Sequence, residues 1–178
     1  GEGALPAVIA CVVSDNAVAP GLERARALGL PAYFVDPAGR KKRDFEEEVA
    51  RTLESHAVDL VCLAGYMRLL SPAFVRRFPA RILNIHPALL PSFAGLHAQQ
   101  QALDYGVKYS GCTVHFVDEG MDTGPIVAQA VVPVGDDDTE DSLSERILRE
   151  EHRLYSEAIR RVLSGAYIID GRRVVVKK

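Results

Sequence analysis

Short apolar runs of strand length alternate with helical segments along this chain. Residues 7–13 (AVIACVV) and 58–64 (VDLVCLA) are rich in β-branched side chains, as in strands that are covered on both faces. Between these runs, the spacing of apolar residues predicts a helix over 22–28, a strand over 32–35 and an amphipathic helix over 44–56. This alternation predicts an α/β fold, a mostly parallel open sheet with helices on both faces, which binds ligands beyond the carboxyl ends of its strands.

The second half of the chain continues the alternation. Ser71 followed by proline predicts a short helix over 72–78, because serine caps helices and proline suits the first turn. Ser142 and Glu145 have the spacing of a capping box, which predicts a long helix from there to about Leu163. The other predicted elements are a strand over 82–86, a helix near 97–105, strands near 112–117 and 125–132, and a C-terminal β-hairpin that turns at Asp170-Gly171.

The composition is that of an ordinary globular protein. With 178 residues, 48% apolar and 25% charged side chains, the chain is expected to form a single domain over 1–178. The net charge is −3 and basic residues are scattered apart from the run 40–43, so we expect no binding to nucleic acid. Neither a bilayer-length apolar run nor a secretory signal is visible, which predicts a cytoplasmic protein without a membrane partner.

The three cysteines indicate neither a disulfide framework nor a zinc site. Cys11, Cys62 and Cys112 lie roughly fifty residues apart, each inside an apolar run. We therefore expect them to pack as small apolar side chains in strands, and we expect no metal.

The strand over 82–86 carries the clearest candidates for chemistry. Because side chains alternate along a strand, Asn84 and His86 share one face and Leu83 and Ile85 the other. Pro87 ends the strand, which puts His86 at the carboxyl edge where α/β sheets bind ligands. The alternative is a strand-end pair that merely hydrogen-bonds a neighbouring loop.

Asp122, in a turn-rich segment between two strands, is a natural carboxylate partner for His86. A nearby carboxylate stabilises an imidazolium ion, and the Asn84 amide could donate a hydrogen bond to an oxyanion. These groups together suit acyl transfer without a protein nucleophile. On its own, however, Asp122 would be interpreted as a solvated turn residue.

The remaining histidines give weaker signals. His115 alternates with Thr113 and Val117 in a predicted strand, so we interpret it as a structural residue of the sheet face. His56, at a helix end, is expected at the surface. Neither histidine is included in the candidate site.

Several long motifs resemble one enzyme family. NIHPALLPSFAG over 84–95, GCTVHFV over 111–117, MDTGPI over 121–126 and LAGYMRLL over 63–70 are similar to phosphoribosylglycinamide formyltransferase of purine synthesis. The resemblance covers almost the whole chain, with the motifs in order. It implies a formyltransferase fold of Rossmann-like type.

The resemblance also implies the reaction. The family transfers a formyl group from 10-formyltetrahydrofolate, its co-substrate, to the amine of glycinamide ribonucleotide, without a metal. It implies Asn84, His86 and Asp122 as the catalytic residues. Asn84 and protonated His86 would stabilise the tetrahedral oxyanion, while Asp122 would hold the histidine charge and help order a water that moves a proton.

The resemblance assigns the binding residues as well. Glu151 matches a residue that contacts the ribonucleotide, although Leu148 stands where the family has a lysine. Arg40 or Arg43 would serve as well as Lys42 near the folate, and Arg68 is expected near the glutamate tail. The folate-binding residues that it implies are Lys42, Met67, Arg68, Leu69, Leu70, Asp118, Glu119, Gly120 and Met121.

One departure from the family lies at the start of the sequence. Family members begin with a further strand and a loop whose backbone N–H groups hold the ribonucleotide phosphate. This sequence starts at Gly1-Glu2-Gly3, so that segment was removed or omitted, or the protein is a fragment that lacks it. The partners are expected to be small-molecule substrates, with the chain a monomer or a homodimer.

Three alternatives to this function remain. A formyltetrahydrofolate deformylase uses water as acceptor, but it usually has a regulatory domain and a His-His pair where this chain has His86-Pro87. Methionyl-tRNA formyltransferase needs a C-terminal RNA-binding domain for which this length leaves no room. The third alternative is a folate-binding module without turnover.

Overall fold

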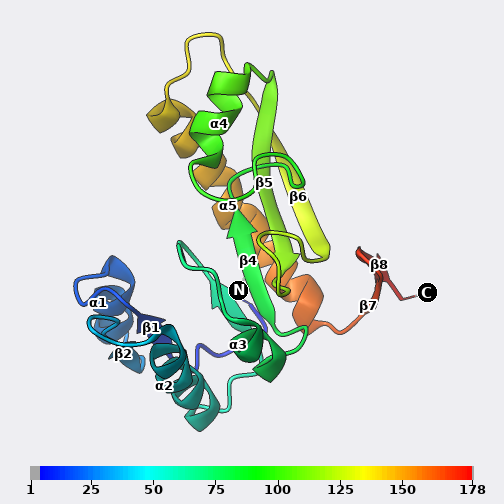
Figure 1. Cartoon of the computed structure of the whole chain (residues 1–178). Helices are drawn as coiled ribbons and strands as arrows, with labels where there is room; N and C mark the ends of the chain where they lie inside the picture. The colour runs from blue at the N-terminus through cyan, green and yellow to red at the C-terminus, as the bar shows by residue number, and fades with distance from the viewer. Residues whose placement is uncertain (1–4, 178) are drawn as a thin grey trace.

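The computed structural model describes residues 5–177, so residues 1–4 of the predicted domain, with the Gly1-Glu2-Gly3 start, and Lys178 lie outside the described residues. The predicted α/β class is confirmed, and the C-terminal hairpin is present (Figure 1). The strands are β1 (Val12–Ser14), β2 (Ala32–Phe34), β3 (Val61–Leu63), β4 (Ile82–His86), β5 (Tyr109–Phe116), β6 (Ile126–Pro133), β7 (Tyr167–Asp170) and β8 (Arg173–Val176). The helices are α1 (Pro20–Ala27), α2 (Lys42–Ser55), α3 (Pro72–Arg77), α4 (Ala98–Tyr105) and α5 (Glu140–Leu163).

Within the described residues, the strands form a two-stranded sheet, β1-β2, and a six-stranded sheet in the order β3-β4-β5-β6-β8-β7. The pairs β1–β2, β3–β4 and β6–β8 are parallel, as the alternation of strands and helices predicts. The pairs β4–β5, β5–β6 and β7–β8 are antiparallel. For β5–β6 the reason is the short segment 117–125 between them, because a parallel pair needs a longer crossover connection.

The first predicted strand is shorter than its apolar sequence suggests. Of the run 7–13, the described strand β1 begins at Val12, and its ladder joins Val12–Ser14 to Ala32–Phe34. The expectation that this run is covered on both faces is wrong for Val8, which is 90% exposed. An apolar run indicates a tendency to pair, but the neighbouring strand determines where the ladder ends.

The predicted caps are confirmed at one helix and corrected at another. Ser71 caps α3, where its hydroxyl accepts a hydrogen bond from the Phe74 amide at 3.2 Å. The long helix begins earlier than predicted, because Thr139 is its N-cap. Thr139 Oγ1 accepts from the Ser142 amide at 3.2 Å, and Ser142 Oγ accepts from the Thr139 amide at 3.0 Å. Ser142 therefore belongs to the capping box as its third helical residue rather than as its first member.

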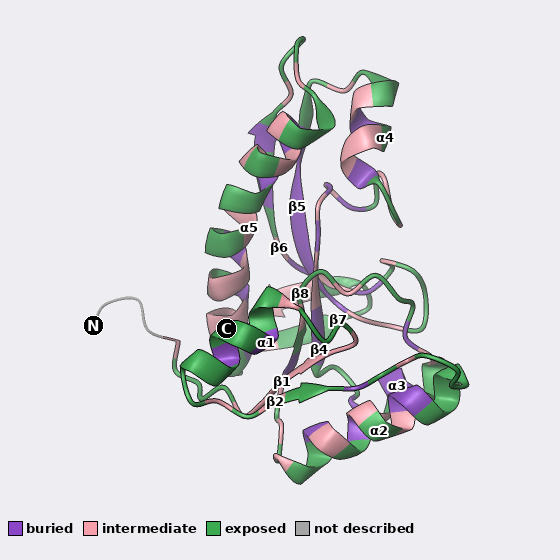
Figure 2. Cartoon of the chain, turned by 90° about the vertical axis from the view of Figure 1, so that its left-hand side faces the viewer, coloured by how far each residue is buried: buried purple, intermediate pink, exposed green. Residues whose placement is uncertain are grey.

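The main core lies between α5 and one face of β5 and β6. In Figure 2 the buried residues lie along β5 and the side of α5 that faces it. Cys112 is buried there as predicted, whereas Cys62, on the edge strand β3 of the six-stranded sheet, is exposed. The Tyr155 hydroxyl of α5 lies 2.8 Å from the Leu63 oxygen and 3.0 Å from the Leu83 oxygen, which ties α5 to β3 and β4.

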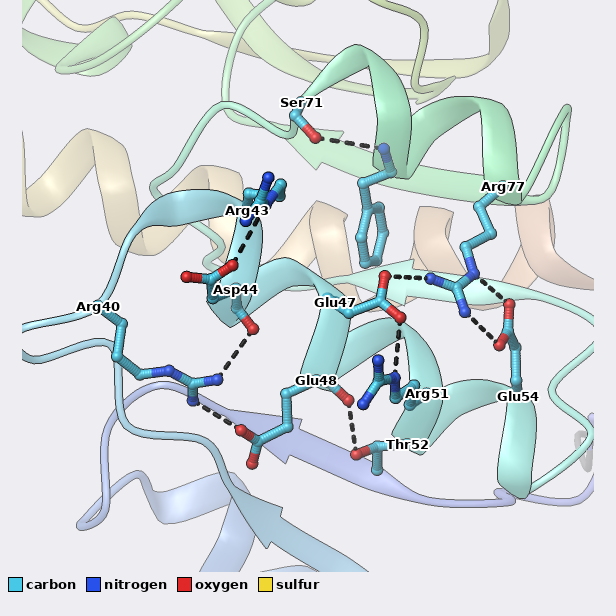
Figure 3. Close-up of polar contacts among 11 residues, drawn as sticks. Arg40, Arg43, Asp44, Glu47, Glu48, Arg51, Thr52, Glu54, Ser71 and Arg77 are labelled. Carbon is cyan, nitrogen blue, oxygen red and sulfur yellow. Dashed lines mark hydrogen bonds and ion pairs between the residues drawn. The ribbon is translucent and has the colours of Figure 1, made fainter.

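A second apolar cluster and a set of ion pairs join α2 to α3. Arg77 of α3 donates to Glu54 of α2 and, at 2.7 Å, to Glu47 of α2 (Figure 3). The buried Glu46 side chain accepts a hydrogen bond from the Ser71 amide at 2.9 Å. These contacts fix the segment that leads from β3 into α3. Across residues 5–177 we find no helix both long and apolar enough to traverse a bilayer.

Candidate active site

The site lies at the carboxyl end of β4, on the face of the strand that carries Asn84 and His86. Leu83 is fully buried on the core side, so Asn84 and His86 point to the opposite face, as predicted. The strand ends at His86, directly before Pro87. His86 is 5% exposed, which makes it one of the buried polar residues of the described chain.

Asp122 approaches His86 from the segment between β5 and β6. The Asp122 Oδ2 atom lies 3.4 Å from His86 Nδ1 and accepts a hydrogen bond from the Gly95 amide at 2.8 Å. On the other side of the ring, His86 Nε2 lies 2.8 Å from the Phe93 carbonyl oxygen, to which it can donate. The structure therefore brings His86 and Asp122 together as predicted, and His86 also bonds the neighbouring loop.

His115 belongs to the same arrangement, although sequence reasoning set it aside. Its Nε2 atom lies 3.6 Å from Asp122 Oδ1 and 3.4 Å from Asn84 Nδ2. Its Nδ1 atom lies 2.9 Å from the Phe116 carbonyl oxygen. His115 is on the sheet face, as predicted, but it links Asn84 to Asp122. The antiparallel register that puts Asn84 opposite His115 is the signal that the sequence lacks.

The surroundings of Asp122 favour its ionised form. The hydrogen bond from His115 lowers the pKa of the Asp122 carboxyl group below its usual value. The Gly95 amide and the nearby charges of His86 and His115 lower this pKa further, while burial opposes them. Each imidazole has one nitrogen at hydrogen-bond distance from a backbone carbonyl and the other facing the same carboxylate.

The segment that carries Asp122 is held by local contacts. Asp118 Oδ1 accepts hydrogen bonds from the Gly120 amide at 3.0 Å and the Thr123 hydroxyl at 2.7 Å. Glu119 forms an ion pair with Arg76 of α3 at 2.7 Å. Among the predicted folate residues, Asp118, Glu119 and Gly120 thus shape the turn, which presents Asp122 to the histidines.

A cavity of about 250 Å³ lies beside β3 and the start of α2. It brings together Lys42, Arg68 and Leu69 from the predicted folate residues, and Arg40 from the alternatives to Lys42. Arg43 is instead an exposed residue paired with its neighbour Asp44. The remaining lining residues are Pro37, Phe45, Glu46 and Tyr66.

The cations of this cavity already have partners of their own. Arg68 Nε donates to Asp15 Oδ2 at 2.8 Å, and its guanidinium lies 5.7 Å from the centre of the Phe45 ring. Lys42 Nζ lies 3.8 Å from a Glu46 carboxylate oxygen and remains half-exposed. Burial, followed by the charge of Glu46, raises the pKa of Tyr66 to about 12, so this phenol stays neutral.

The other predicted binding residues differ in exposure. Leu70 is buried in the apolar cluster beside α3, so its side chain serves the core. Met67 and Met121 are both exposed. Glu151 lies on α5, where burial raises the pKa of its carboxyl group. In residues 5–177, His, Cys, Asp and Glu form no group of three or more suited to hold a metal, and the absence of a metal stays a prediction.

Comparisons with known proteins agree with this architecture. A sequence model described as formyl transferase matches residues 1–159. The trifunctional purine biosynthetic protein adenosine-3 of Drosophila melanogaster is 46% identical over 162 residues. That match spans 90% of this chain but 12% of the fly protein, so the chain corresponds to a small part of that relative.

Shorter relatives match over most of their length. Phosphoribosylglycinamide formyltransferase of Bacillus subtilis is 42% identical over 155 residues, which are 86% of this chain and 80% of that protein. The crystal structure of glycinamide ribonucleotide transformylase 1 from Symbiobacterium toebii is 54% identical, with a TM-score of 0.95 over 98% of this chain and 82% of that one. A formyltetrahydrofolate deformylase from Pseudomonas syringae is 31% identical, with a TM-score of 0.87 over 98% of this chain and 58% of that one. The chain therefore belongs to the formyl transferase family, among the phosphoribosylglycinamide formyltransferases.

Proposed function

We propose that this chain transfers a formyl group from 10-formyltetrahydrofolate to the amine of glycinamide ribonucleotide, in the cytoplasm. The observation that carries the proposal is the carboxylate of Asp122 between two buried imidazoles, His86 and His115, at the carboxyl end of β4. Such a site stabilises charge and moves protons, which is what formyl transfer between two nitrogens requires.

The first chemical step is attack of the amine on the formyl carbon, which forms a tetrahedral oxyanion. The Asn84 Nδ2 group and protonated His86 are the donors proposed for it. His86 Nε2 now lies 2.8 Å from the Phe93 carbonyl, so the oxyanion would replace that carbonyl as acceptor. A charged acceptor forms a stronger hydrogen bond than a neutral carbonyl, which favours this exchange in the transition state.

The second step moves a proton from the attacking amine to the leaving nitrogen of the folate. Asp122 remains ionised because its pKa is lowered, so it can order a water for this transfer and stabilise the histidine cation. His115 is proposed as a positioning residue, since it contacts both Asn84 and Asp122.

The cavity beside α2 is proposed to hold the folate tail. Lys42 and Arg68 would pair with its carboxylates, and Leu69 supplies an apolar wall. The exposed thioethers of Met67 and Met121 would contact the ring system, with backbone groups of 118–120 reading its polar edge. Glu151 is proposed to contact the ribonucleotide.

A formyl-transfer assay tests this proposal. The purified chain, and a version extended at its amino terminus, receive 10-formyltetrahydrofolate with and without glycinamide ribonucleotide. Formylated ribonucleotide by mass spectrometry, formed in proportion to tetrahydrofolate, is expected. Formate release without formylated ribonucleotide would instead indicate hydrolysis, and folate binding without either product would indicate a binding module; both results would overturn the proposal.

A further inference from the structure

Both methionines of the sequence are exposed and lie at the proposed folate site. The chain contains two methionines, Met67 and Met121, which are 73% and 56% exposed. Met67 lies in the segment after β3, and Met121 directly precedes Asp122. Methionine is usually buried, whereas these two thioethers are exposed and therefore open to solvent oxidants.

Met121 differs from Met67 in what its thioether contacts. A Cβ atom built on Gly95 would lie 3.4 Å from Met121 Sδ and 3.5 Å from its methyl carbon. The thioether therefore lies against the bare backbone of Gly95. The amide of this same glycine donates to Asp122 Oδ2 at 2.8 Å. Met121 thus packs beside the hydrogen bond that holds the carboxylate.

We propose that Met121 is a modification site, at which oxidation to the sulfoxide turns off the formyl transfer proposed above. The inference rests on that proposed function. An oxygen atom passes from a peroxide to the sulfur: the peroxide O–O bond breaks, an S–O bond forms, the sulfur is oxidised, and the peroxide leaves as water. Methionine sulfoxide reductase reverses the step with a dithiol as its reductant: the sulfoxide oxygen leaves as water while the dithiol becomes a disulfide.

The physical consequence follows from the contact with Gly95. The sulfoxide oxygen adds bulk and polarity on the side of Gly95 where the apolar thioether now lies, with its sulfur 3.4 Å from the position that a Cβ atom would take. The turn that carries Asp122 must move away from Gly95, which weakens the Gly95–Asp122 hydrogen bond. His86 and His115 then lose the position of their shared counter-ion. A displacement of this kind lowers kcat steeply, by roughly tenfold to a hundredfold.

Met67 provides the matched comparison within the chain. It is the more exposed of the two methionines, so peroxide is expected to oxidise it at least as readily. If exposure at the folate site were enough, either sulfoxide would inactivate the enzyme. If the contact with Gly95 matters, Met121 oxidation will account for the loss of kcat.

The test uses the whole chain and its Met67→Leu and Met121→Leu variants, each compared with its own untreated sample. Each is treated with hydrogen peroxide and then with dithiothreitol, which reverses cysteine disulfides but not sulfoxides, and each sulfoxide is counted by its mass increase of about 16 Da. The proposal expects Met67→Leu to lose kcat by roughly tenfold or more as Met121 is oxidised, and Met121→Leu to keep most of its own kcat. Equal losses in the two variants, or an oxidised Met67→Leu with unchanged kcat, would overturn it.

A second measurement does not depend on turnover. Hydrogen exchange of the Gly95 amide is followed by NMR before and after oxidation of Met67→Leu. Exchange that accelerates on oxidation of Met121, and returns after treatment with methionine sulfoxide reductase and a dithiol, supports the proposal. Unchanged exchange at full oxidation overturns it. An untreated chain without formyl transfer would instead contradict the proposed function, so the two failures are distinguishable.

Discussion

Asn84 on β4 lies directly opposite His115 on β5, with Asn84 Nδ2 3.4 Å from His115 Nε2. The same imidazole nitrogen lies 3.6 Å from Asp122 Oδ1, so it serves the two neighbours in different states: it accepts from the Asn84 amide when unprotonated and donates to the carboxylate when protonated. The site is therefore a connected row of polar groups across two strands and a turn.

Replacing His115 by phenylalanine should change the pH dependence of turnover. The hydrogen bond from His115 is the largest cause of the lowered pKa of Asp122, so its loss raises that pKa. Since the ionised carboxylate is the active form, the acid limb of the kcat profile should move to higher pH. His115→Gln, whose amide can still donate, should recover part of the shift. A profile identical to that of the natural chain would contradict the positioning role.

His86→Asn tests the direct role of the imidazole. Asparagine keeps a hydrogen-bond donor on β4 but cannot carry the positive charge of a protonated imidazole, so kcat should fall by roughly 10²- to 10⁴-fold. Folate affinity, measured by fluorescence or calorimetry, should change little, because the proposed contacts of the tail lie in the cavity beside α2. His97→Asn is the matched control: His97 is exposed and has a φ of 58°, a conformation that asparagine tolerates. Equal losses of kcat and affinity in His86→Asn would reject its chemical role.

Lys42→Gln should separate folate binding from chemistry. Lys42 is half-exposed at the cavity, and its side chain lies 3.8 Å from a Glu46 oxygen. Removing its charge should raise KM for the folate several-fold, with kcat unchanged, and the effect should shrink at high salt. Lys41→Gln, the neighbouring exposed lysine that does not line the cavity, should leave KM unaltered. A fall in kcat with unchanged KM in Lys42→Gln would contradict a role in binding.

Local reasoning from the sequence identified the strand but not its neighbours. Alternation was enough to place Asn84 and His86 on one face, and Pro87 marked the end of the strand. The link through His115 depends on the antiparallel register of β4 and β5, which no local pattern encodes. The exposure of Cys62 likewise depends on what packs over its face of β3, which its apolar run does not indicate.

In the motifs beyond that strand too, the sequence indicated residue types but not the contacts between distant segments. The approach of Asp122 to His86 was predictable as a pairing of residue types. The hydrogen bond that Asp122 accepts from the Gly95 amide, however, depends on how two loops pack together. The start of α5 was misplaced because Thr139, not Ser142, supplies the N-cap hydroxyl, and both residues suit that position by type.

The ion pairs between α2 and α3 lead to a prediction about stability. Hydrogen bonds from Arg77 lower the pKa of Glu54, and those from Arg51 and Arg77 lower the pKa of Glu47 (Figure 3). A carboxyl group with a lowered pKa in the folded state stabilises the fold above its unfolded pKa, and this contribution is lost as pH falls through the folded value. Arg77→Gln should therefore lower Tm by roughly 2–4 °C at neutral pH.

The difference in Tm between Arg77→Gln and the natural chain should disappear at acid pH. Below the lowered pKa values both carboxyl groups are protonated in the folded chain, so Arg77 has no charge to pair with and the two melting temperatures should converge at acid pH, below those values. Arg43→Gln, which removes an exposed guanidinium paired with its neighbour Asp44, should leave Tm within about 1 °C of the natural value at both pH values. Calorimetry across this range checks both variants. A Tm difference for Arg77→Gln that stays constant from neutral to acid pH would show that Arg77 acts by packing rather than by charge.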